Sequence, residues 1–418
     1  MDVMKVFLFM FTSLIFISSY IKNKDLFSPV KVYIAFSFVF YAGIYFTNVH
    51  WETLACYFFI ILIIFICLFF EPKVKNNSVR RKKINIDKYI TPIWLVSIPG
   101  VVVMLSLLIM AGSLEKYFYQ LSFRVKDWAG IGYLTIWFSM IPALNLLYFS
   151  AIILDKKPTK TKRLLFLIHF IIFIIIGILT ASRSFIATNI LGMLFVYSYL
   201  VAMVKVRYIV TATFLILFFS GVMGAIRNDF GNTQNIESNN STLFENSHFK
   251  YGIIPLELIF SSNIHNLQYG KTYLTVFTNF IPRYIYPDKP DTGGISFTKI
   301  YTGNKYRGLS NLATGSITEG IVNFGLVIGV FIGIIFTLLS FLFGCIYYRG
   351  FIKRLNGSEK QEQLKVIFYF YIIIAISRLT YSEFTDVIYS IIFSVFIPYF
   401  MVSILKNTAL TSLRRGNG

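Results

Sequence analysis

The side chains of this sequence that could do chemistry are arginines and a few carboxylates placed between long apolar runs. Arg183 lies in TASRS between two such runs, Arg227 ends another in GAIRNDFG, and Arg283 lies in NFIPRYIYPDKPDTGG. A guanidinium presents a rigid fork of donors that matches phosphate oxygens. Ser182 and Ser184 add hydroxyls beside Arg183 at a predicted helix junction, which also suits an anion. We predict a phosphate site at a membrane surface; the plainer alternative is arginines that reach from helix ends to water.

Arg283 has the most informative surroundings. Gly294 follows it at R-x10-G spacing, and several prolines and the aromatic residues Tyr284 and Tyr286 lie close to it in the chain. Proline fixes φ and stiffens a turn. The pattern predicts a rigid turn in which Arg283 binds phosphate while Tyr284 and Tyr286 contact a sugar. The alternative is an aromatic and proline packing corner with a surface arginine.

Two further arginines lie in the predicted outer connections. Arg307, in NKYRGLS, either joins the phosphate site or is a solvated loop cation, and the second explanation is the simpler one. Arg378 lies near Glu383 and Asp386 in a tight turn between two apolar runs. These three side chains either form an ion-pair set that closes the turn, or they add Arg378 to the phosphate site with one acid as an alternative base.

Glu319, in SNLATGSITEGIVNFG, is the predicted general base. A carboxylate at the start of an apolar helix has its pKa raised by burial or lowered by a nearby arginine. The alternatives are capping of the helix and a salt bridge that orients an arginine. His265 is the only other candidate base in this stretch. We find no nucleotide-binding glycine loop, nucleophile elbow or metal-binding spacing, so no metal and no cofactor are predicted.

Composition then defines the setting in which these residues act. Of 418 residues, 56% are hydrophobic and only 14% are charged, and the mean hydropathy is +0.67. Soluble domains carry about 25% charged residues, so a soluble enzyme and a disordered chain are both excluded. Because a bilayer core needs roughly 20 apolar residues per helix, the pattern predicts an all-α polytopic membrane protein with eleven spans: 4–21, 31–47, 53–71, 90–111, 132–154, 164–181, 184–204, 208–226, 325–347, 365–381 and 384–404.

The net charge of +20 follows from topology. Lys and Arg collect in the connections predicted to be cytoplasmic, above all in 72–89, as the positive-inside rule requires. The N-terminus is therefore predicted outside and the C-terminus inside, and no nucleic acid is needed to explain the charge. We divide the chain into spans 1–8 (1–226), a large periplasmic loop with interfacial helices (227–324), and spans 9–11 with a cytoplasmic tail (325–418). Gly325, Gly329 and Gly333 open the ninth span at a spacing that permits close helix packing.

The layout and several motifs together resemble the bacterial O-antigen polymerase family. The shared features are eleven spans, a large outer loop, SRS after a span, the pattern PR…P…KP…GG, and TEG..NFG opening the next span, and they are clearest over about 180–330. The family is described with two R-x10-G motifs, and here only Arg283 fits that spacing.

The resemblance implies a fold, an activity and partners. The fold would be a membrane glycosyltransferase of GT-C type in the bacterial inner membrane. The enzyme would move a growing glycan from undecaprenyl pyrophosphate onto a new lipid-linked repeat unit at the periplasmic face, together with a chain-length regulator and a flippase. Pyrophosphate would contact Arg183, Arg227, Arg283, Arg378 and Arg307, and Glu319 with Arg283 would be catalytic.

Two other functions remain open at this stage. An O-antigen ligase uses the same donor, glycosylates the lipid A–core, and would need an outer-loop histidine such as His265 or His248. A flippase or transporter would show charged residues in mid-span or inverted repeats, and the predicted spans are nearly free of charge.

Overall fold

The computed structural model describes residues 2–73, 83–122, 132–180, 182–204, 207–208, 211–212, 248–262, 266–281, 283–302, 311–355 and 362–415. Within these ranges the regular structure is helical, apart from one isolated bridge between Ile84 and Asp155. Large apolar side chains are exposed along the long helices, for example Val3, Ile109 and Phe331. Such surfaces are stable against lipid and costly in water.

The described helices confirm that the protein is an all-α membrane protein. Seven are long and apolar enough to cross a bilayer: Asp2–Lys22, Trp51–Phe70, Asp87–Ala111, Gly132–Ile153, Lys160–Leu179, Leu326–Leu355 and Phe384–Asn407. Three more predicted spans coincide with shorter helical segments, Pro29–Tyr45, Ser184–Leu200 and Val366–Arg378. The predicted span 208–226 lies almost wholly outside the described residues, so the number eleven and the GT-C type stay predictions.

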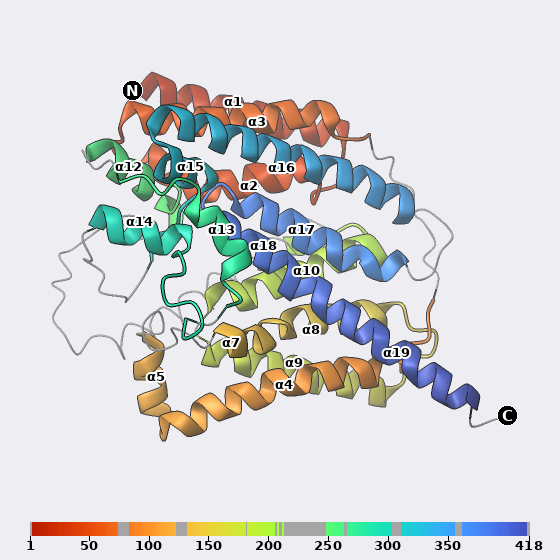
Figure 1. Ribbon diagram of the computed structural model, residues 1–418. Helices are drawn as coiled ribbons and strands as arrows, with labels where there is room; N and C mark the ends of the chain where they lie inside the picture. The colour runs from red at the N-terminus through yellow and green to blue at the C-terminus, as the bar shows by residue number, and fades with distance from the viewer. Residues whose placement is uncertain are drawn as a thin grey trace. The chain divides into compact units, whose positions relative to one another are not determined.

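The chain forms two compact units, and the first contains Met1–Asn77, Glu237–Lys353 and Ile372–Tyr389. Its long helices α1, α3 and α16 run side by side (Figure 1). Two apolar stretches of the large loop form the short helices α12 and α13. The elements of this unit are α1 (Asp2–Lys22), α2 (Pro29–Tyr41), η1 (Ala42–Tyr45), α3 (Trp51–Phe70), η2 (His248–Lys250), α12 (Ile254–Ser261), α13 (Lys271–Thr278), α14 (Gly293–Thr302), α15 (Ser316–Phe324) and most of α16 (Leu326–Leu355), with the end of α17 (Val366–Arg378) and the start of α18 (Phe384–Ile391).

Helices α15 and α16 form a tight hairpin, and glycines make it possible. Gly325, between them, has φ +82, a left-handed conformation that glycine adopts without strain. A Cβ on Gly320 would lie 2.2 Å from the carbonyl oxygen of Gly329, and one on Gly333 would lie 2.5 Å from the Cα of Ile317. The predicted packing role of Gly329 and Gly333 is therefore confirmed, and the two backbones are in direct contact.

The second unit contains Ser78–Ile236, Arg354–Tyr371 and Ser390–Gly418. In its interior His169 contacts Ser97 at 2.9 Å and Asn145 at 3.1 Å, which satisfies a polar side chain between apolar helices. Its remaining elements are α4 (Asp87–Ala111), α5 (Leu114–Ser122), α7 (Gly132–Ser139), α8 (Ile141–Ile153), α9 (Lys160–Leu179), α10 (Arg183–Leu200), η3 (Glu362–Lys365), the π-helix η4 (Ile392–Phe396) and α19 (Ile397–Arg415).

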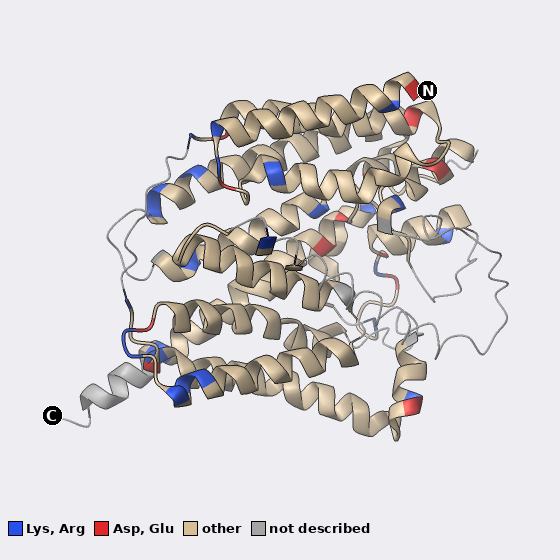
Figure 2. Cartoon of the chain, turned by 180° about the vertical axis from the view of Figure 1, so that it is seen from behind, with Lys and Arg blue, Asp and Glu red and all other residues tan. Residues whose placement is uncertain are grey.

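A buried ion pair joins the first three helices of the first unit. The Nζ of Lys31 on α2 lies 3.8 Å from Oε1 of Glu71, just after α3, and both side chains are almost fully buried. Ser19 on α1 donates to Oε2 of Glu71 at 2.7 Å, and Lys31 donates to the carbonyl of Asn23 at 2.6 Å and to Ser28 at 2.9 Å. Figure 2 shows charged residues mostly near helix ends, where this pair also lies.

We expect Gly329→Ala to destabilise the first unit. The new methyl group would overlap the backbone of Gly320, and overpacking of this kind costs about 1–3 kcal/mol. The unfolding midpoint in detergent, measured by tryptophan fluorescence, should fall by several degrees. Gly132→Ala is the control, because a Cβ there meets nothing within 4 Å. Equal midpoints for the two variants would contradict the backbone contact.

The buried ion pair gives a second prediction. Glu71→Gln removes the carboxylate that pairs with the buried Lys31 and should destabilise the protein by about 3–5 kcal/mol. The double variant Lys31→Met/Glu71→Leu removes both charges and should regain most of that loss. Unfolding in denaturant measures both, and a double variant as unstable as Glu71→Gln would show that the lost packing, and not the unpaired charge, sets the cost.

Candidate active site

Glu319 lies in the first turn of α15, and only 1% of its surface is exposed. Its Oε1 accepts a hydrogen bond from the hydroxyl of Thr272 on α13 at 2.8 Å, and its Oε2 accepts one from the backbone N–H of Phe384, the first residue of α18, also at 2.8 Å. Asn323 donates to the Thr272 hydroxyl at 2.7 Å. The carboxyl predicted as a base is therefore enclosed and holds three helices together.

Glu383 is the neighbour of Glu319 across the start of α14. It accepts a hydrogen bond from the backbone N–H of Gly294, in the first turn of that helix. A Cβ on Gly293 would lie 2.9 Å from Oε1 of Glu319 and 3.3 Å from the Cβ of Glu383. The two glycines of the KPDTGG stretch therefore let α14 begin against both glutamates, and Gly294 serves as a donor to Glu383.

Both carboxyls titrate near neutrality. Burial raises the pKa of Glu319 to about 7, although the N–H of Phe384 and the hydroxyl of Thr272 act in the opposite direction. Burial also raises the pKa of Glu383 to about 7; the N–H of Gly294 opposes this shift, and the carboxylates of Glu319 and Asp386 add to it. Two interacting acids lose their protons as a pair. A carboxyl with a pKa near the working pH can take up or release a proton during a reaction.

Arg283 lies in a cluster of cations that we call the cationic corner. It donates to Oδ1 of Asp291 at 2.6 Å, and Lys299 of α14 donates to Oδ2 of the same carboxylate at 2.5 Å. Lys289 is close enough that the charge of Arg283, in addition to burial, lowers its pKa. Two of these cations pair with Asp291, whereas the Nζ of Lys289 donates to backbone carbonyls, and the side chain of Arg283 is 48% exposed. The corner has positive charge left to attract an anion.

A polar cavity of about 170 Å³ adjoins the cationic corner. Asp291 of the corner is followed directly by Thr292, which lines the cavity, and Glu383 and Asp386 form part of its wall. Arg378 pairs with Asp386, so the predicted ion pair closing this turn is present. The polar residues that line the cavity are Thr292, Asn311, Thr314, Ser382, Glu383 and Asp386.

The first unit therefore contains Arg283, Glu319 and Arg378 of the predicted site. Tyr284 and Tyr286 follow Arg283 and are 83% and 39% exposed, so their rings are accessible. Arg183 is the first residue of α10, and its side chain is not among those described. Arg227, Arg307 and His265 lie outside the described residues, so their roles stay predictions.

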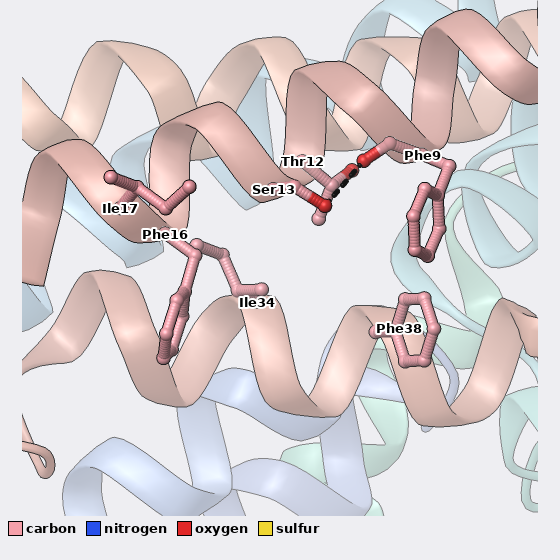
Figure 3. A pocket seen from close by; sticks show the side chains of 7 residues that line it. All are labelled: Phe9, Thr12, Ser13, Phe16, Ile17, Ile34 and Phe38. Carbon is pink, nitrogen blue, oxygen red and sulfur yellow. Dashed lines mark hydrogen bonds between the residues drawn. The ribbon is translucent and has the colours of Figure 1, made fainter.

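A second cavity, between α1 and α2, is apolar. Figure 3 shows the rings of Phe9, Phe16 and Phe38 around it. The hydroxyl of Thr12 donates to the carbonyl of Leu8, and that of Ser13 donates to the carbonyl of Phe9, each within its own helix turn. With both hydroxyls satisfied, this groove presents hydrocarbon and takes no part in the polar site.

The comparisons with known proteins give no family for this chain: no family model, no curated protein and no solved structure matches it. The polymerase resemblance therefore depends on the sequence motifs alone.

The glutamate pair predicts a pH dependence of stability. The pKa of both carboxyls rises from 4.5 to about 7 on folding, so the folded state binds protons more tightly. The stabilisation by protonation is complete below about pH 4.5 and is lost as pH rises through 7. The unfolding midpoint should therefore fall between pH 5 and pH 8. Glu319→Gln/Glu383→Gln should flatten this slope, whereas Glu115→Gln on α5 should keep it; an unchanged slope in the double variant would exclude the pair as its source.

Proposed function

We propose that this chain is a membrane glycosyltransferase that polymerises oligosaccharide repeat units carried on undecaprenyl pyrophosphate. One observation carries the proposal: a cationic corner built on Arg283 adjoins a polar cavity whose wall includes a carboxyl that titrates near neutrality. The first suits a diphosphate leaving group, and the second suits the hydroxyl that replaces it.

The reaction assigns a task to each part. An acceptor hydroxyl oxygen attacks the anomeric carbon of the donor glycan and forms a new C–O bond, while the bond from that carbon to the pyrophosphate oxygen breaks. The pyrophosphate leaves with the electron pair, and Arg283, Lys289 and Lys299 stabilise its negative charge. The hydroxyl proton passes to the glutamate pair, which can accept it at neutral pH.

The remaining parts of the proposal follow from the family resemblance. Arg183, Arg227, Arg307 and Arg378 would add to pyrophosphate binding, and Tyr284 would contact sugar through its exposed ring. The chain would lie in the inner membrane with its N-terminus in the periplasm and its C-terminus in the cytoplasm. A flippase would supply the lipid-linked units, and a chain-length regulator would set the extent of polymerisation.

Replacing Arg283 tests the function. In a strain that lacks the chromosomal gene, the plasmid-borne wild type should restore a ladder of long polysaccharide on immunoblots. Arg283→Ala should leave core plus one repeat unit, because losing a main stabiliser of the leaving group costs about 10²–10³-fold in rate. Arg283→Lys keeps the charge but not the fork and should be intermediate. Arg349→Ala on α16, an arginine whose side chain donates to the carbonyl of Phe70, is the control and should keep the ladder.

The outcomes separate the candidate functions. A single-repeat phenotype on deletion supports a polymerase, whereas lipid A–core without any repeat points to a ligase or an earlier step. A full ladder from Arg283→Ala would remove Arg283 from the site. Turnover that is lost after EDTA treatment of the purified protein and restored by Mg²⁺ would contradict charge stabilisation by arginine and lysine alone.

A further inference from the structure

The wall of the polar cavity includes a threonine whose hydroxyl is buried. Thr314 lines the cavity, and its side chain is 1% exposed. Among the described residues, none forms a hydrogen bond with its Oγ1. Leaving a buried hydroxyl without a partner costs about 1–3 kcal/mol. Twelve buried side-chain atoms lack a hydrogen-bond partner among the described residues, and of these only the Oγ1 of Thr314 belongs to a residue that lines the polar cavity. The cavity volume of about 170 Å³ is well above the roughly 10–15 Å³ that one water needs.

The wall of the cavity selects against anions. The charge of Asp386 is compensated by its pair with Arg378, and Glu383 adds a carboxyl that repels a phosphate when it is ionised. Asn311, Ser382 and Thr314 instead offer amide and hydroxyl groups that both donate and accept. Apart from Arg378, which is paired with Asp386, the cations described in this region lie in the cationic corner around Asp291. The cationic corner therefore suits a diphosphate, and the polar cavity suits an uncharged group rich in hydroxyls.

We propose that the polar cavity binds the acceptor sugar ring, with Glu383 taking the proton of the attacking hydroxyl and Thr314 bonding a second ring hydroxyl. This rests on the proposed function, because it divides that reaction between two neighbouring subsites. The proton moves from the acceptor oxygen to the carboxylate of Glu383 as the new C–O bond forms, and the electron pair of the broken bond leaves with the pyrophosphate.

The geometry assigns the proton to Glu383, and Glu319 becomes a positioning residue. Glu319 is enclosed, and its two oxygens are bonded to Thr272 and Phe384. Glu383 lines the cavity and immediately precedes Phe384 in the chain. Glu319 accepts the N–H of Phe384, the residue after Glu383, and it also lies against Gly293 at the start of α14. Glu319 therefore helps to position Glu383.

Binding of simple sugars tests the cavity directly. The full chain in lipid nanodiscs is titrated with the methyl glycosides of glucose, galactose, mannose and N-acetylglucosamine, and saturation-transfer NMR reports binding. At least one should bind, and Thr314→Val should weaken that binding about 3- to 10-fold, the effect of one neutral hydrogen bond. Thr314→Ser should bind as the wild type does, because it keeps the hydroxyl.

A matched control separates binding from folding. The hydroxyl of Thr278 on α13 is also buried without a partner among the described residues, but Thr278 does not line the cavity. Thr278→Val and Thr314→Val should each keep or raise the unfolding midpoint, because each replaces an unsatisfied hydroxyl with a methyl group. Only Thr314→Val should lose sugar affinity. Binding to none of the four glycosides, or equal binding by both valine variants, would overturn the proposal.

Turnover measurements distinguish the roles of the two glutamates. Glu383→Gln should abolish turnover while the sugar affinity of the cavity stays within a few-fold. Glu319→Gln keeps its shape and should retain measurable turnover with a shifted pH–rate profile, since the charge next to Glu383 changes. Full turnover in Glu383→Gln would overturn its assignment as proton acceptor.

Sugar binding and the polysaccharide ladder distinguish the acceptor site from the polymerase function. If sugar binding depends on Thr314 but deletion of the gene leaves the polysaccharide ladder intact, the sugar site is supported and the polymerase function is contradicted. If the ladder depends on Arg283 but the cavity binds no glycoside, the polymerase function is supported and the acceptor site is contradicted.

Discussion

The enclosure of the Glu319 carboxyl constrains every element around it. An ionisable group removed from water is costly unless its oxygens are bonded. Here the bonds come from Thr272 and from the backbone of Phe384, so α13 and α18 must meet at α15. The next residue, Gly320, touches the backbone of Gly329 on α16. The close approach of two backbones and the burial of one carboxyl are therefore parts of the same arrangement, and neither could change alone.

The proposed division into an anion site and a sugar site depends on this arrangement. Because Glu319 fixes Phe384, it also fixes Glu383, which in turn accepts the N–H of Gly294 at the start of α14. The positive end of a helix dipole favours a negative charge at that point. Asp291, shortly before the helix, collects Arg283 and the other cations outside the cavity. A few residues of chain thus separate a basic surface from an acidic one.

The sequence predicts the spans better than the site, for a physical reason. Hydropathy is a local property, so the apolar runs, the tight turn at 378–386 and the glycine stripe could be predicted from neighbouring residues. The Glu319–Glu383 pair could not, since 64 positions separate its members and their meeting depends on the packing of α14 between them. The pattern R-x10-G includes Gly294, but the N–H of this glycine serves Glu383, whereas Arg283 binds Asp291. Thr314 carries no sequence signal, because an unsatisfied hydroxyl is visible only after its surroundings are built.

The first unit buries charges in two places, and the difference between them bears on function. Lys31 and Glu71 are opposite charges with further partners in Ser19 and Ser28, so each favours the charged state of the other. Such a pair fixes the helices that carry it. Glu319 and Glu383 are both acids, and the carboxylate of Glu319 makes ionisation of Glu383 less favourable. A fold that needed only stability would gain by replacing one of them with an uncharged residue. Keeping two acids beside a polar cavity, at the cost of stability above pH 7, is the pattern typical of a site that handles protons.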